Sequence, residues 1–184
     1  MTRVMAASAP ASGPVSGLVS GSGSGSASGS GSASASGSGS ASASGSGSVS
    51  AVQALQTALA AEDAAIFGYG VAGAHLSGNR KSAAEQDWTG HNEARDTLTA
   101  MISALGAPPA AGQAFYRLPF QVNDAASAAK LAAYLEEGVT RAYLGMVAVS
   151  DQRLRTFGAL AMQVCAQRAA FWRGSTQAFP GLEP

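Results

Sequence analysis

Apolar side chains in residues 50–76 recur alternately every three and four positions, which is the spacing of one face of an α-helix. A second stretch with this spacing follows a polar turn at residues 77–81 and ends at a glycine and two prolines, Gly106, Pro108 and Pro109. The two stretches predict an antiparallel helical hairpin. Its inward positions are Val52, Leu55, Leu59, Glu62, Ile66, Tyr69, Gly73 and Leu76, then Ala84, Trp88, His91, Arg95, Leu98, Ile102 and Leu105.

The C-terminal part of the chain predicts a second hairpin. Asp124 is placed to cap a third helix that ends near Val149, and a fourth helix extends from about residue 153 to about residue 177. On a helical wheel Glu136 falls inside the apolar face of the third helix and Glu137 outside it. The other inward positions are Leu131, Ala132, Leu135, Val139, Ala142, Tyr143, Met146 and Val147, and in the fourth helix Phe157, Leu160, Val164 and Phe171.

About 17 residues containing AFYRLPFQV join the two hairpins, which is too long for a tight turn. Such a segment spans about 55 Å when extended, whereas a helix of 25 residues is about 37 Å long, so it can run along the whole bundle. The sequence therefore predicts an all-α, four-helix bundle of two antiparallel hairpins and a long crossover, the ferritin-like connectivity. We expect Phe115, Tyr116, Leu118 and Phe120 to cover a seam between helices; their exposure would indicate a partner surface instead.

Composition divides the chain into two parts. Residues 1–49 are almost entirely Ser, Gly and Ala, which cannot bury enough apolar surface to fold, so we expect a disordered tail or linker before a bundle at residues 50–184. No apolar run is long enough for a signal peptide or a membrane span, and we expect a cytoplasmic protein. Equal numbers of acidic and basic residues, 11 each, argue against a nucleic acid or a membrane as partner. The single cysteine, Cys165, excludes an internal disulfide and is expected to pack in the core.

Several segments carry a family resemblance: AAEDAAIFGYGVAGAHL, GHNEARDTL, FYRLPFQVNDAASAAKLAAYLEEGVTRAYLGMV and RAAFWRGSTQAFPG. Together they resemble an alanine-rich, ferritin-like domain family of unknown function from actinobacteria, over residues 52–182. The family commonly has histidine where this chain has Asp63, and residues 93–96 vary its second motif. The resemblance implies the four-helix fold but supplies no activity.

The ligands of a di-iron centre can be counted along the predicted helices. Such a centre needs a Glu on two helices and a Glu-x-x-His pair on the other two. Glu62, His91 and Glu136 face inward, but Trp88 stands where the motif needs Glu, and no Asp, Glu or His lies between Asp151 and Glu183. A di-iron centre therefore cannot be assembled within one chain, and we expect no cofactor. A mononuclear iron or manganese site of Glu62, His91 and Glu136 is the alternative.

The same positions predict a buried polar layer. Equal distances from the hairpin turns place Arg95 at the level of Glu62 and Arg168 at the level of Glu136. An inward guanidinium neutralises a carboxylate without an ion, so we expect two Glu–Arg pairs, with His91 and Tyr69 hydrogen-bonded beside them. Replacing Glu62 by Gln would then cost about 3 to 5 kcal/mol. Glu85 and Asp87 are interpreted as a solvated face.

Three functions are compatible with these features. The leading hypothesis is a non-catalytic bundle with a structural or interaction role, whose Glu/Arg/His layer replaces a di-iron centre. One alternative is an oxidoreductase or storage protein that binds iron or manganese with an atypical ligand set. In one form of this alternative, a second chain of a dimer completes the ligand set. The other alternative is a small-molecule carrier whose apolar pocket lies between the helices and the aromatic crossover, with the Arg/Glu layer orienting a polar head group. Ala- and Gly-rich helices suit pairing into a homodimer, but no reaction, substrate or protein partner is indicated.

Overall fold

A computed structural model describes residues 50–178 and 181. The predicted tail, residues 1–49, lies outside this part of the chain. Within it there are four α-helices and no strand, so the all-α prediction is confirmed. No helix of this part is both long and apolar enough to cross a membrane. The helices are α1 (Ala51–Ala74), α2 (Gly78–Ala104), α3 (Ala125–Val147) and α4 (Gln152–Arg173).

The helix ends follow from their capping residues. The Ser50 hydroxyl accepts a hydrogen bond from the Gln53 amide at 3.1 Å at the start of α1. Asp124 caps α3 as predicted, in a reciprocal capping box with Ser127. α4 ends at Gly174, whose positive φ of 76° takes the left-handed conformation that stops a helix, a few residues before the predicted end. The first turn is shorter than predicted, because α2 already begins at Gly78.

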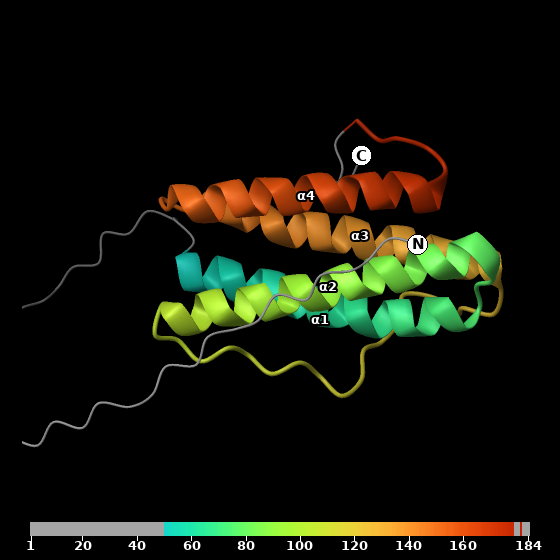
Figure 1. Cartoon of the computed structure of the whole chain (residues 1–184), viewed down its shortest axis with the longest axis horizontal. Coiled ribbons are helices and arrows are strands. Elements are labelled where there is room, and N and C mark those ends of the chain that lie inside the picture. The colour runs from blue at the N-terminus through green and yellow to red at the C-terminus, as the bar shows by residue number, and fades with distance from the viewer. Residues whose placement is uncertain (1–49, 179–180, 182–184) are drawn as a thin grey trace, which may run out of the picture. The chain divides into compact units, whose positions relative to one another are not determined.

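The four helices form two hairpins that lie against each other (Figure 1). α1 packs against α2 and α3, and α3 packs against α4, with antiparallel neighbours in each case; α2 and α4 have no comparable contact. Two clusters of buried apolar residues form the core, one around Leu55, Leu98 and Met146 and the other around Leu131 and Trp172.

The crossover, residues 105–124, runs back along α1 (Figure 1). Gln56 holds it there, since its Nε2 donates to the Pro108 carbonyl at 2.8 Å and its Oε1 accepts from the Ala110 amide at 2.9 Å. Tyr116, Leu118 and Phe120 are half-buried as expected. Phe115 is 70% exposed, against the prediction, although its ring meets Phe67 edge-on at 6.0 Å.

The inward face of α4 is not the predicted one. Phe157 packs against the core as predicted, but Leu160, Val164 and Phe171 are exposed. The residues that α4 buries instead are Leu154, Gly158, Cys165, Ala169 and Trp172. Both stripes of α4 have helical spacing, so periodicity alone could not distinguish them. Trp88, Leu105 and Val147, also predicted inside, are exposed as well.

Gly158 is required for the close approach of α4 to α3. A Cβ added there would lie 2.8 Å from the Met146 Cβ and 3.4 Å from the Tyr143 carbonyl oxygen. We expect Gly158→Ala to lower the free energy of unfolding by about 1 to 3 kcal/mol through overpacking. The control is Gly138→Ala in α3, where a Cβ has no neighbour within 4 Å and the change stabilises the helix by up to about 1 kcal/mol. Urea unfolding measures both, and effects of the same sign would contradict the packing.

Candidate functional site

One histidine joins three helices in the buried polar layer. His91 of α2 places its Nδ1 2.6 Å from Oε2 of Glu62 on α1, and its Nε2 3.0 Å from Oε1 of Glu136 on α3. All three residues are at most 1% exposed. The structure therefore brings together the three residues that the sequence selected, with the imidazole between the two carboxylates.

Charge accounts for this arrangement. Burial alone would lower the pKa of His91, but the hydrogen bonds with Glu136 and Glu62 raise it to about 9. At neutral pH the ring is thus an imidazolium, and each nitrogen donates to one carboxylate. A buried ion triad of this kind is held together by charge-assisted hydrogen bonds.

Two tyrosines donate further hydrogen bonds to the carboxylates. Tyr143 donates its hydroxyl to Oε1 of Glu62 at 2.7 Å, and Tyr69 donates to Oε1 of Glu136 at 2.7 Å. Burial and the neighbouring carboxylate charges raise the pKa of both phenols, so both remain protonated donors. Tyr69 was predicted in the layer, whereas Tyr143 was predicted only as part of an apolar face.

Asp87 is a member of the layer that the sequence interpretation missed. Its carboxylate binds Nε of Arg168 at 2.9 Å and accepts from the Trp172 indole at 2.8 Å. Burial raises the pKa of Asp87, although the Trp172 hydrogen bond and the Arg168 charge oppose this. The predicted Arg168–Glu136 pair is present but longer, at 3.9 Å. Asp87 lies one helical turn before His91 and therefore on the same face of α2, and this spacing could have predicted its place in the layer.

The predicted Glu62–Arg95 pair is wrong. The Arg95 guanidinium binds the neighbouring Asp96 carboxylate at 2.8 Å, and its side chain is 34% exposed. Arg95 lies about 40° around the helix from His91, which puts it at the edge of the buried face. Glu62 meets His91 and Tyr143 instead.

The layer does not fit a metal as it is arranged. Both nitrogens of His91 are occupied by carboxylates, so neither is open to an ion. Nothing on α4 adds a carboxylate or an imidazole, and the described residues contain no group of three or more His, Cys, Asp or Glu placed to hold one. Among the side-chain nitrogen and oxygen atoms of the described residues, only Oε2 of Glu136 is buried without a hydrogen-bond partner.

A cleft of about 340 Å³ lies between α2 and α4, on one side of the layer. Its polar lining includes Glu62, His91, Cys165 and Arg168. Burial, and then the Glu136 and Glu62 charges, raise the pKa of Cys165, so its thiol is neutral. The apolar lining consists of Gly90, Ala94, Tyr143, Phe157, Leu160, Ala161 and Val164.

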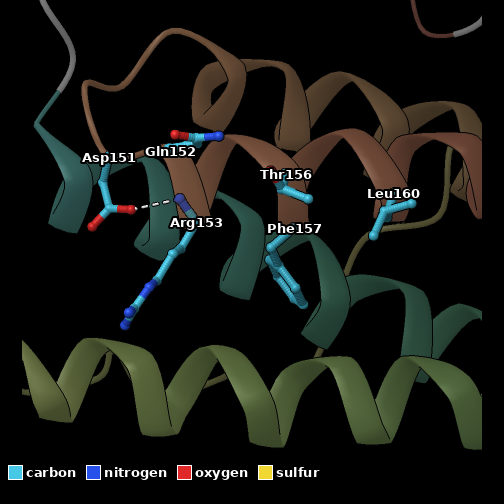
Figure 2. Close-up of a pocket in the computed structure, with 6 residues that line it drawn as sticks. All are labelled: Asp151, Gln152, Arg153, Thr156, Phe157 and Leu160. Carbon is cyan, nitrogen blue, oxygen red and sulfur yellow. Dashed lines mark hydrogen bonds between the residues drawn. The ribbon is translucent and has the colours of Figure 1, made fainter.

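A second, more open hollow continues along the N-terminal half of α4. It shares Phe157 and Leu160 with the cleft and extends to Asp151. Figure 2 shows Arg153 and Phe157 projecting from α4 toward α2. Sequence reasoning missed both hollows because it placed Leu160 and Val164 in the core.

Comparison with known proteins places the chain in a family. The family described as a domain of unknown function, DUF4439, matches residues 54–184. A crystal structure of a conserved hypothetical protein, rv2844, from Mycobacterium tuberculosis is similar, with a TM-score of 0.64 and 33% sequence identity over 66% of this chain and 92% of that chain. No curated protein matches the sequence. The predicted resemblance to a domain family of unknown function is thus confirmed, and the chain belongs to the DUF4439 family.

Proposed function

We propose that this domain is a non-catalytic, ferritin-like bundle with a structural or interaction role, in which a protonated histidine takes the place of a di-iron centre. The observation that carries the proposal is the engagement of both His91 nitrogens by Glu62 and Glu136, at 2.6 and 3.0 Å. The long crossover between two antiparallel hairpins supports the ferritin-like comparison.

The protonation states of the layer also favour a role without catalysis. General acid–base chemistry needs a group that exchanges its proton near the working pH, within reach of a substrate. His91 holds its proton between two carboxylates, and burial keeps the Tyr69, Tyr143 and Cys165 groups protonated. None of these four is poised as a base or nucleophile at neutral pH.

The direct test is metal content. Protein incubated anaerobically with ferrous iron or manganese and then desalted is expected to retain less than roughly a tenth of an equivalent by mass spectrometry, and its unfolding should not change with a strong chelator. The His91→Ala variant serves as the control. One or more equivalents in the wild type, lost in this variant, would overturn the proposal and favour a metal-binding oxidoreductase or storage protein.

The cleft favours a second candidate, a small-molecule carrier. Ligand sites are concave and mostly apolar, with a few polar groups that orient the ligand. The smallest of them have volumes of about 300 Å³. The α2–α4 cleft, with about 340 Å³, apolar walls and Glu62 and Arg168 in its lining, has these properties.

A further inference from the structure

The charged side chains of the polar layer sum to one net negative charge. The carboxylates of Glu62, Asp87 and Glu136 face the cations of His91 and Arg168, which leaves one negative charge. The hydrogen-bond and contact partners of these five are two phenols, an indole and a thiol, and all are neutral. The charges of Asp63 and Arg95, which interact with each other beside Glu62, offset each other and leave this sum unchanged. An uncompensated charge in a desolvated layer is costly, so a cationic group that reaches it would be stabilised.

The excess charge adjoins the cleft. Glu62 itself lines the cleft, and Glu136 lies against Arg168 and Cys165, which line it too. Glu136 is 0% exposed, and its Oε2 is the buried acceptor without a partner described above. The neighbouring donor is the Cys165 thiol, which interacts with Glu136 but donates only weakly. The oxygen is thus a second sign, independent of the charge count, that the layer accepts a stronger hydrogen-bond donor.

The walls of the cleft define the rest of the ligand. Leu160 and Val164 are 59% and 45% exposed, and Phe157 and Ala161 continue the same apolar wall on α4. Across the cleft, Gly90 and Ala94 of α2 present little side chain. Gly90 also gives the Arg168 guanidinium room to lie close to α2, where a Cβ would collide with it. The space therefore suits an apolar chain rather than a second polar group.

We propose that the α2–α4 cleft binds an amphipathic small molecule with a protonated amine head group, which meets the Glu62 and Glu136 carboxylates while its apolar chain lies along Leu160 and Val164. This inference rests on the carrier function proposed above and names its ligand class. An anionic head would add a second negative charge to the layer, and a neutral head would leave the existing charge unpaired.

The test compares three probes of equal chain length: hexylamine, hexanol and hexanoate. Titration calorimetry with the full chain is expected to give saturable binding of hexylamine at least about tenfold tighter than of the other two. Val164→Trp, which fills the cleft from an exposed position, should weaken hexylamine binding by at least about tenfold. Leu144→Trp is the matched control, because Leu144 is also exposed but does not line the cleft, and its binding should be unchanged.

The failures can be told apart. Equal binding of all three probes, or tighter binding of hexanoate, would overturn the amine assignment but keep a carrier. No binding of any probe, or binding that Val164→Trp leaves unchanged, would remove the cleft as a carrier site. The metal measurement tests the layer itself and does not depend on either result.

Discussion

Replacing Glu62 by Gln is expected to lower the free energy of unfolding by about 3 to 5 kcal/mol. Glu62 accepts hydrogen bonds from His91 at 2.6 Å and Tyr143 at 2.7 Å with its side chain fully buried. Without its charge, the imidazolium retains one carboxylate partner instead of two. The sequence predicted an effect of the same size from a Glu62–Arg95 pair. In the structure the cause is still a buried charge that loses its partner, but the charged partner of Glu62 is His91.

Glu93→Gln is the control for this variant. Glu93 is exposed on α2, two residues from His91, so its neutralisation should change the free energy of unfolding by less than about 0.5 kcal/mol. Urea unfolding followed by circular dichroism measures both variants. A loss within about 0.5 kcal/mol for Glu62→Gln would contradict the buried triad.

Stability is expected to fall as the pH rises from about 6.5 to about 9. The pKa of His91 is raised from 6.5 to about 9 in the folded protein, so the folded state binds more protons across this window than the unfolded state. The stabilisation by His91 is fully present below pH 6.5 and is lost as the pH rises through the folded pKa. At about 1.4 kcal/mol per pH unit for one proton, the free energy of unfolding should decrease by about 3 kcal/mol in total.

The two histidines of the chain permit a matched comparison. His75→Gln, at the exposed end of α1, should retain the decrease with pH, whereas His91→Gln should lose it. Denaturant unfolding at several pH values up to 9 gives the slope before tyrosine and lysine side chains of the unfolded chain begin to ionise. The Cys165 thiol, whose pKa is raised by burial, adds a smaller decrease near pH 9 in every variant, so the comparison rests on the slope between about pH 6.5 and 8. A wild-type stability that stays flat or rises over this window would show that His91 is not held as a cation.

The sequence predicted features that depend on local periodicity and capping. The spacing of apolar residues located all four helices, and Asp124 located the start of α3. Inward positions of Glu62, His91 and Glu136 followed from the same periodicity, because each lies near the centre of its helix's buried face.

Features that depend on the rotation of a helix about its axis could not be predicted from apolar spacing and capping. α4 has apolar residues on two faces, and the choice between them depends on Gly158, whose missing side chain lets α3 approach. That choice exposes Leu160 and Val164 and creates the cleft. Asp87 was taken for a solvated residue because its partners on α4 are about eighty residues away in sequence, at Arg168 and Trp172.

Nuclear magnetic resonance of the ring nitrogens, in protein labelled at histidine, shows directly whether a protonated histidine lies between the two carboxylates. Only two rings contribute, and His75→Gln assigns them. Both nitrogens of His91 are expected to carry protons at neutral pH, and the ring is expected to titrate near 9. A ring with one unprotonated nitrogen at neutral pH, or a titration at or below the ordinary value of 6.5, would contradict this protonated state.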